Sequence, residues 1–185
     1  MARGTEAMSS RRELRFAGEG GQGVILGGAI LAEALILYEG KYAVQSPHYG
    51  SRVRGGPTKV DIIVADRPVL FPRAKEIEFF LCLAQMSYEK YSDGLASEAT
   101  VLVDSNLVPN APENGRDIHR LPIVEIAKME LGNAVLSNSV ALGAVMKLTH
   151  IASEDAIWQA IEARVPPKTI DINRRAFERG IELVP

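Results

Sequence analysis

Short runs of β-branched and aromatic residues alternate along the chain with segments in which hydrophobic residues recur at helical spacing. The short runs predict strands at residues 13–17, 41–45, 58–65, 76–84, 100–105 and 117–121. The helical spacing predicts helices at residues 22–38, 87–91, 122–131, 138–149, 153–163 and 171–179. Because strands and helices alternate, we expect an α/β fold, a Rossmann-like three-layer sandwich with a mainly parallel sheet.

The predicted helix at residues 22–38 carries hydrophobic side chains around almost its whole circumference. Such a helix is normally buried on every side. One side can pack against the sheet, and we expect the other to need another subunit or a second copy of this chain. The pattern therefore predicts an obligate assembly, and self-association of the chain when it is isolated.

Length and composition favour one compact domain. The chain has 185 residues, 46% of them hydrophobic, which is enough for a sizeable core. Residues 1–12 are small and polar, so we expect a flexible tail there and a single α/β domain at residues 13–185. The tail lacks the apolar segment of a signal peptide, and the longest apolar run is too short to span a membrane. These features predict a cytoplasmic protein with no membrane contact.

Charge and cysteine content exclude several kinds of site. A formal net charge of −2 offers no general attraction for nucleic acid. The single cysteine, Cys82, lies between two leucines and is expected to be an inert core thiol. One thiol is too few for an iron–sulfur cluster or a structural zinc site, so we expect no metal site on this chain. Any redox centre is therefore expected to lie elsewhere.

A glycine cluster, GEGGQGV, follows the first predicted strand and opens the first helix. Gly18, Gly20 and Gly23 have the spacing GxGxxG, and bare amides at a helix start favour an anion. The acidic residue that holds an adenosine ribose is missing from the end of the second strand, and Glu39 lies before that strand. This argues against NAD but keeps a phosphate or pyrophosphate as a candidate ligand. The alternative is that the glycines serve only tight packing.

A second glycine-rich segment, at residues 45–57, has no strand or helix period and contains HYGSRVRGG. Its arginines offer a planar fork to phosphate or carboxylate, and its glycines let a ligand approach the backbone. The alternative is a surface loop whose arginines pair with acidic side chains. His48 lacks a recognisable catalytic partner and is expected to form hydrogen bonds within the loop. Asn138 is expected to cap the helix that follows it.

Taken together, these motifs resemble the gamma subunit of the 2-oxoacid:ferredoxin oxidoreductases, the pyruvate/ketoisovalerate oxidoreductase catalytic-domain family. The segments that carry the resemblance are GEGGQGV at 18–24, GKYAVQS at 40–46, YGSRVRGG at 49–56, DIIVAD at 61–66, NSVALGA at 138–144 and NRRAFERG at 173–180. The AVQS and RGG segments are most similar to the 2-oxoglutarate branch. The loop departs from the usual family pattern, which has a proline and an acidic residue at the positions of Ser51 and Arg52.

The resemblance implies an enzyme that converts a 2-oxoacid and coenzyme A into acyl-CoA and carbon dioxide and passes two electrons to ferredoxin. Thiamine diphosphate, magnesium and iron–sulfur clusters would be bound by alpha and beta subunits, and by a delta subunit where one is present. This chain would bind no cofactor alone and would not be catalytic alone. It would help to close the active site and contribute to binding the co-substrate, coenzyme A.

The resemblance also assigns candidate residues, because coenzyme A carries a 3′-phosphate and a pyrophosphate that suit glycine amides and arginines. The candidates are Gly18, Gly20, Gly21, Gln22, Gly23, Ser51, Arg52, Arg54, Gly55, Gly56 and Asn138. No catalytic residue is expected on this chain. Two alternatives stay open: a free-standing Rossmann-like nucleotide-binding enzyme, and a purely structural assembly subunit.

Overall fold

In the computed structural model, which describes residues 11–50 and 55–185, six strands form one sheet. The sheet order is β2-β3-β1-β4-β5-β6. The strands are β1 (Arg12–Glu19), β2 (Tyr42–His48), β3 (Pro57–Ala65), β4 (Ile77–Cys82), β5 (Leu95–Asp104) and β6 (Asp117–Leu121). β3 runs antiparallel to β1 and β2, whereas β1, β4, β5 and β6 are mutually parallel. The predicted α/β fold with a mainly parallel sheet is confirmed.

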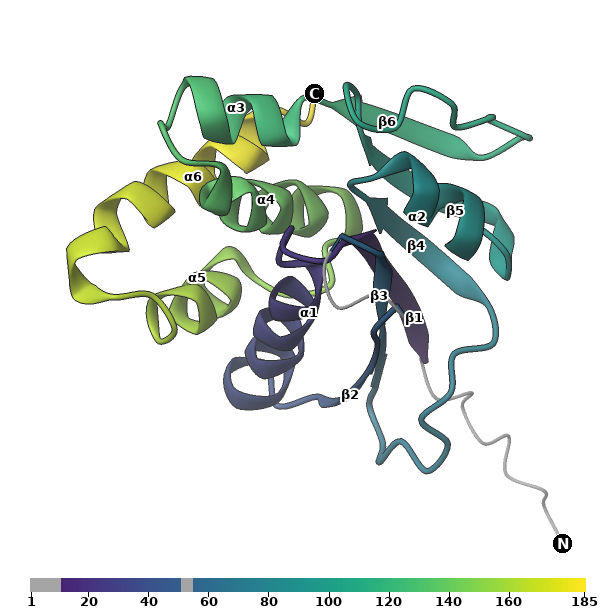
Figure 1. The fold of residues 1–185 in the computed structure, drawn as a ribbon. Helices are drawn as coiled ribbons and strands as arrows, with labels where there is room; N and C mark the ends of the chain where they lie inside the picture. The colour runs from purple at the N-terminus through teal and green to yellow at the C-terminus, as the bar shows by residue number, and fades with distance from the viewer. Residues whose placement is uncertain (1–10, 51–54) are drawn as a thin grey trace, which may run out of the picture.

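Helices cover the two faces of the sheet unequally (Figure 1). One face carries α1 (Val24–Glu33), α3 (Ile123–Met129), α4 (Ser137–Thr149), α5 (Glu154–Glu162) and α6 (Ile170–Glu182), and the other carries α2 (Gln85–Tyr91). A π-helical turn, η1 (Ala34–Tyr38), ends α1, and short 3₁₀ turns η2 (Ala134–Leu136) and η3 (Pro167–Thr169) precede α4 and α6. Within the described ranges, no helix is both long and apolar enough to cross a membrane.

Side chains that alternate along the strands build two separate cores. Leu14 and Phe16 of β1 point into the larger core, which also contains the buried faces of α1, α3, α4, α5 and α6. Ala17 points to the opposite face, into the smaller core beneath α2. This alternation is what a strand with side-chain period two requires when both of its faces are covered.

A close crossing of α4 and α6 supports the helical layer. A Cβ added to Gly143 would overlap the carbonyl oxygen of Phe177, and one added to Gly180 would overlap that of Val140. The absence of side chains at these two glycines lets the helix backbones touch. Residues 138–144 and 173–180, which were separate motifs in the sequence, are therefore halves of one contact.

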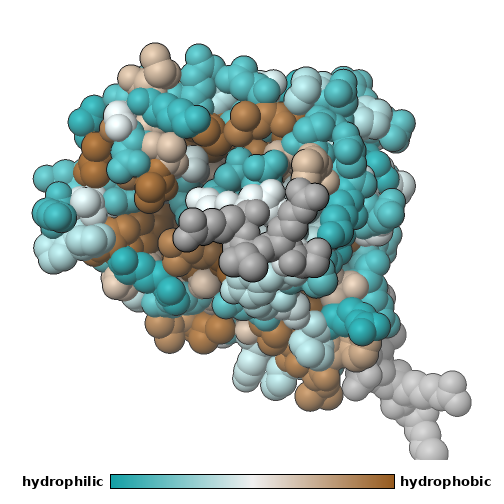
Figure 2. Space-filling model, in the orientation of Figure 1, coloured by the Kyte–Doolittle hydropathy of each residue, from teal (hydrophilic) through white to brown (hydrophobic). Residues whose placement is uncertain are grey.

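The outer side of α1 is covered differently from what the sequence predicts. The helix packs against β3 on one side and against α4 and α5 of the same chain on the other, and residues 27, 28 and 30–32 in its middle are buried. The expectation that this side needs another subunit is therefore wrong for the middle of the helix. Hydrophobic side chains remain exposed at the two ends, Leu26 near the start and Ile36, Leu37 and Tyr38 in η1. Figure 2 shows hydrophobic surface over α1 and the helices beside it.

Candidate functional site

The glycine cluster lies where the sheet changes its winding direction. From the carboxyl end of β1 the chain passes through α1 to the edge strand β2, whereas β4 lies on the other side of β1. Ligands of open α/β sheets bind outside the carboxyl ends of the strands at such a switch point. We call residues 18–23 the glycine turn, and it occupies this position.

Hydrogen bonds within the glycine turn use several of its own polar groups. The side chain of Gln22 accepts a hydrogen bond from the Glu19 amide at 2.6 Å and donates one to the Leu83 carbonyl at 2.8 Å. The backbone amide of Gln22 donates to the backbone carbonyl of Glu19 at 3.1 Å. The Gln22 side chain therefore fixes the turn against the end of β4, and a direct contact with a ligand stays a prediction.

The start of α1 offers the backbone donors that an anion needs. The Gly27 amide donates to the Gly23 carbonyl at 2.9 Å. The backbone amides of residues 24–26 come before this bond and have no acceptor within the helix. Gly23 occupies the N-cap position without a side-chain cap, and the first turn contains no acidic residue. The positive end of the helix dipole is thus not neutralised by this helix itself. These features suit a phosphate group.

Asn138 lies in the first turn of α4, with its side chain against the glycine turn. α4 begins at Ser137 and its N-cap is Leu136, so the prediction that Asn138 caps the helix is wrong. The preceding 3₁₀ turn draws Asn138 into the helix. Gly23 has a φ of 74°, and a Cβ there would overlap the Asn138 side-chain amide. Asn138 and the glycine turn, distant in sequence, therefore form one site.

Two hollows flank the glycine turn and share Gly21 and Gly23. The smaller, about 260 Å3, lies beside Tyr49 and Thr58. The larger, about 520 Å3, extends between α1 and the elements α3, η2 and α4, with Asn138 and Lys128 in its lining. A third hollow of about 360 Å3 continues from Leu26 and Asn138 along α5 and α6. The site thus has room on both sides of the turn.

The second glycine-rich segment approaches the glycine turn through Gly56. Its carbonyl accepts a hydrogen bond from the Gly20 amide at 3.1 Å. Gly55 is exposed with a φ of 72°. The candidates Ser51, Arg52 and Arg54 lie outside the described residues. The structure therefore brings Gly55 and Gly56 to the site, while the role of the three remaining residues stays a prediction.

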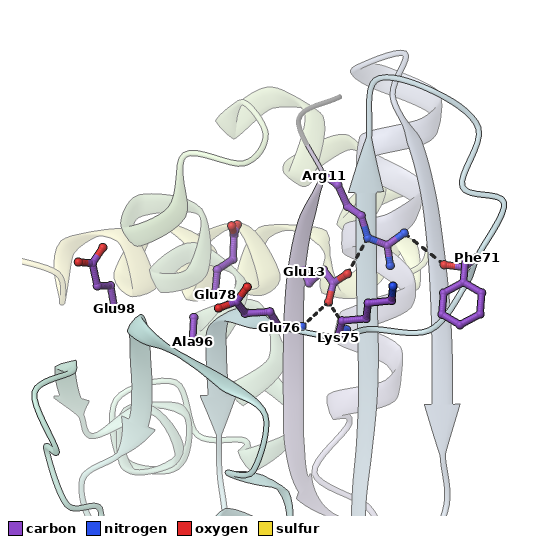
Figure 3. A pocket seen from close by; sticks show the side chains of 8 residues that line it. All are labelled: Arg11, Glu13, Phe71, Lys75, Glu76, Glu78, Ala96 and Glu98. Atoms are coloured by element: carbon purple, nitrogen blue, oxygen red, sulfur yellow. Dashed lines mark hydrogen bonds and ion pairs between the residues drawn. The ribbon is translucent and has the colours of Figure 1, made fainter. Parts of the chain in front are cut away.

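A different hollow, about 660 Å3 in volume, lies at the opposite end of the strands from the glycine turn (Figure 3). Glu13, Glu78 and Glu98 line it near the amino ends of β1, β4 and β5. The Glu13 carboxylate accepts hydrogen bonds from Arg11 and from the amides of Lys75 and Glu76. Because its buried carboxylate is already paired and it lies away from the carboxyl ends of the strands, we do not assign the ligand site here.

Two other residues have structural roles, and Cys82 is the inert core thiol that the sequence predicts. Cys82 is buried, and burial raises the pKa of its thiol to about 12, which keeps it protonated and unreactive. Asp104 accepts hydrogen bonds from the amides of Asn106, Leu107 and Val124, so it closes the turn after β5. Neither is available for catalysis. No group of three metal-ligating side chains occurs in residues 11–50 and 55–185.

Sequence reasoning did not single out Thr58 and Ser87, although both touch the glycine turn. Ser87 of α2 donates to the Gly18 carbonyl at 2.7 Å, and Thr58 of β3 donates to the same oxygen at 3.1 Å. The partners are 69 and 40 residues apart in the sequence. No local pattern connects a hydroxyl to such a distant carbonyl.

Comparison with known proteins establishes the family. The sequence profile of the pyruvate ferredoxin/flavodoxin oxidoreductase family matches residues 13–183. The chain belongs to this family. The 2-oxoglutarate synthase subunit KorC of Methanocaldococcus jannaschii is 39% identical over 175 residues, which make up 94% of this chain and 94% of that relative.

Solved structures of this oxidoreductase family have the same fold. The gamma subunit of a keto/oxoacid ferredoxin oxidoreductase from Geobacter sulfurreducens is 41% identical, with a TM-score of 0.86 over 94% of this chain and 95% of that one. The 2-oxoglutarate:ferredoxin oxidoreductase of Magnetococcus marinus, solved with 2-oxoglutarate, coenzyme A and succinyl-CoA, has a TM-score of 0.84. It is 22% identical and the match covers 94% of this chain and 31% of that chain, so it shows the fold alone.

Membership of the oxidoreductase family confirms the resemblance drawn from the sequence motifs. The chain is an oxidoreductase subunit, and other subunits are implied. The match to a third of the Magnetococcus chain indicates that this fold can also be part of a longer polypeptide.

Proposed function

We propose that this chain is the gamma subunit of a 2-oxoglutarate:ferredoxin oxidoreductase and that it binds coenzyme A at the glycine turn. The complete enzyme converts 2-oxoglutarate and coenzyme A into succinyl-CoA and carbon dioxide, and two electrons pass to ferredoxin. The choice of 2-oxoglutarate is supported by the full-length likeness to KorC. Alpha and beta subunits are the partners, and a delta subunit where the complex has one.

The observation that carries the proposal is the uncapped start of α1 at the switch point of the sheet. Backbone amides there, together with the arginines of residues 51–54, hold a phosphate of coenzyme A. Binding energy from a phosphate remote from the thiol orients the thiol for reaction elsewhere in the complex. The contribution of this chain is therefore positional.

The electron-transfer and decarboxylation chemistry belongs to the other subunits. Thiamine diphosphate, bound there, supplies the carbanion chemistry that decarboxylates the 2-oxoacid. The only cysteine of this chain is buried and protonated, so it does not fit an exposed cluster ligand. The residues of this chain bind the co-substrate and close the site.

The test is a steady-state assay of the complex purified from its host through a tag on this chain. Dye reduction should depend on both 2-oxoglutarate and coenzyme A, and should be faster with 2-oxoglutarate than with pyruvate. A complex that prefers pyruvate would overturn the choice of substrate. A lone chain that retains a nucleotide would favour the free-standing nucleotide-binding enzyme.

A charged variant tests whether coenzyme A touches this chain. Gly21 is exposed, and a side chain there would meet no atom within 4 Å, so Gly21→Asp places a carboxylate at the mouth of the site. We expect the KM for coenzyme A to rise about tenfold while kcat changes little. Gly115→Asp is the matched control, because Gly115 also has a positive φ and open space but lies in the loop before β6. An unchanged KM in Gly21→Asp would support the purely structural subunit.

A further inference from the structure

The carbonyl oxygen of Gly18 accepts two side-chain hydrogen bonds at the point where β1 enters the glycine turn. Ser87 Oγ donates at 2.7 Å and Thr58 Oγ1 at 3.1 Å. Ser87 is fully buried and Thr58 is 7% exposed, so water does not readily replace either donor. Gly18 and Thr58 are antiparallel partners in the same alternation as the Gly20–Gly56 bond, so the Thr58 backbone amide also faces this oxygen and the two hydroxyls share its remaining lone pair.

The two hydroxyls reach the carbonyl from two different elements, β3 and α2. Thr58 lies on β3, where it is the antiparallel partner of Gly18. Ser87 lies on α2, which packs against β1 and β3 on one face of the sheet. The neighbouring bonds from Gly20 to Gly56 and from Gln22 to Leu83 tie the turn to the residue before β3 and to the residue after β4. The glycine turn is thus held between β3 and the connection from β4 to α2.

The packing around Gly18 leaves little room for this peptide to change direction. A Cβ on Gly18 would lie 2.6 Å from Gln22 Oε1 and 2.9 Å from Val24 Cγ1. The Gly18 backbone therefore lies directly against the side chains of Gln22 and Val24 at the start of α1. The two hydroxyls help to fix the direction of the Gly18 peptide, because a hydrogen bond weakens steeply when donor and acceptor are misaligned.

We propose that Thr58 and Ser87 are positioning residues that aim the amides at the start of α1 toward the phosphate of coenzyme A. The proposal rests on the proposed function, because it concerns the same site. The hydroxyls are engaged with the Gly18 carbonyl and act on the ligand through the turn. Their loss should raise the KM for coenzyme A and leave kcat nearly unchanged, since the reacting groups lie elsewhere.

The shared acceptor predicts a specific pattern of non-additivity. With one hydroxyl removed, the other still occupies the second lone pair of the Gly18 carbonyl. With both removed, that lone pair of a buried carbonyl is left without a donor, which costs more than the loss of either single bond. The two substitutions should therefore be cooperative in a double-mutant cycle.

The experiment compares Thr58→Val, Ser87→Ala and the double variant in the assembled enzyme. We expect the KM for coenzyme A to rise about threefold in each single variant and more than about twentyfold in the double variant, at unchanged kcat. Thr58→Ser keeps the hydroxyl and should restore the wild-type KM. Thr149→Val is the control, because Thr149 makes a similar bond to the Val145 carbonyl, at 2.7 Å, at the far end of α4.

The outcomes separate this inference from the proposed function. If Gly21→Asp raises the KM and neither Thr58→Val nor Ser87→Ala exceeds Thr149→Val, only the positioning role is overturned. If Gly21→Asp has no effect, coenzyme A does not bind at the turn and both proposals fail. The positioning role is also overturned if the KM of the double variant rises only by the product of the two single-variant effects, or if kcat falls at constant KM. If the double variant does not assemble, the single variants against Thr149→Val decide the question.

Discussion

The guanidinium of Arg15 and the carboxylate of Asp61 form a bidentate ion pair across β1 and β3, with Nε to Oδ1 at 2.6 Å and Nη2 to Oδ2 at 3.2 Å. Both side chains are buried. Arg15 also donates to the carbonyls of Tyr91 and Asp93 at the end of α2, and Lys59 donates to Asp61 at 2.7 Å. This pair joins two strands and a helix end on the face of the sheet away from α1.

Removing one member of this pair should destabilise the chain strongly. In Asp61→Asn the guanidinium of Arg15 loses its charged partner while buried, so the free energy of unfolding should fall by about 3 kcal/mol. Urea unfolding followed by circular dichroism measures the change. Glu178→Gln removes an exposed helical pair with Arg174 and should cost less than about 0.5 kcal/mol. Equal losses in the two variants would contradict the importance of burial.

The same carboxylate gives the stability a defined pH dependence. Burial alone would raise the pKa of Asp61, but hydrogen bonds and charge from Arg15 and Lys59 outweigh it and lower the pKa below its ordinary value of 3.8. Protonation is thus harder in the folded chain, so the stabilisation is complete above that value and is lost as the pH falls through the lowered pKa. The difference in unfolding free energy between wild type and Asp61→Asn should shrink below about pH 4. A difference that grows on acidification would show that the sign is wrong.

The crossing of α4 and α6 predicts a second sensitive position. Gly180→Ala places a methyl group against the Val140 carbonyl, a backbone atom that can move only if the helices separate. Overpacking of this kind should lower the free energy of unfolding by about 3 kcal/mol. Gly115→Ala, where a methyl group meets no atom within 4 Å, should cost about 1 kcal/mol from its positive φ alone. Similar losses of unfolding free energy in the two variants would mean that α4 and α6 can move apart at little cost.

The strands were predictable because each is a short hydrophobic run between turn residues. All six predicted strands occur, from β1 to β6. Their order was not predictable. β3 inserts beside β1 in the antiparallel direction, so the strand that follows α1 becomes an edge strand. The acidic residue that holds an adenosine ribose in NAD-binding folds comes at the end of a strand next to β1. Here β3 separates β2 from β1, so a residue after β2 would not reach a ligand at the glycine turn.

The candidate site was predictable only where backbone geometry leaves a mark in the sequence. Glycine is required at Gly23 because of its positive φ, and this requirement is visible as a motif. The hydroxyls of Thr58 and Ser87 leave no such mark, because threonine and serine are common in strands and helices and their partner is a backbone oxygen. The position of Asn138 inside α4 depended on a 3₁₀ turn that shifts the helix start by one residue. Such details follow from tertiary packing.

The contact between Gly23 and Asn138 leads to a prediction with an internal rescue. Gly23→Ala suffers two penalties, a positive φ of 74° and overlap of the new methyl group with the Asn138 side chain. We expect it to raise the KM for coenzyme A more than Gly21→Ala, since Gly21 has a φ of 102° but open space around it.

Adding Asn138→Ala to Gly23→Ala removes the overlap and leaves only the backbone strain. The KM of the double variant should therefore fall back toward that of Gly21→Ala, even though Asn138→Ala alone raises the KM if its amide helps to bind the ligand. Steady-state kinetics of the assembled enzyme measures all four variants. If Asn138→Ala worsens Gly23→Ala by the same factor as it worsens the wild type, the two residues do not interact and the site is not the single unit described above.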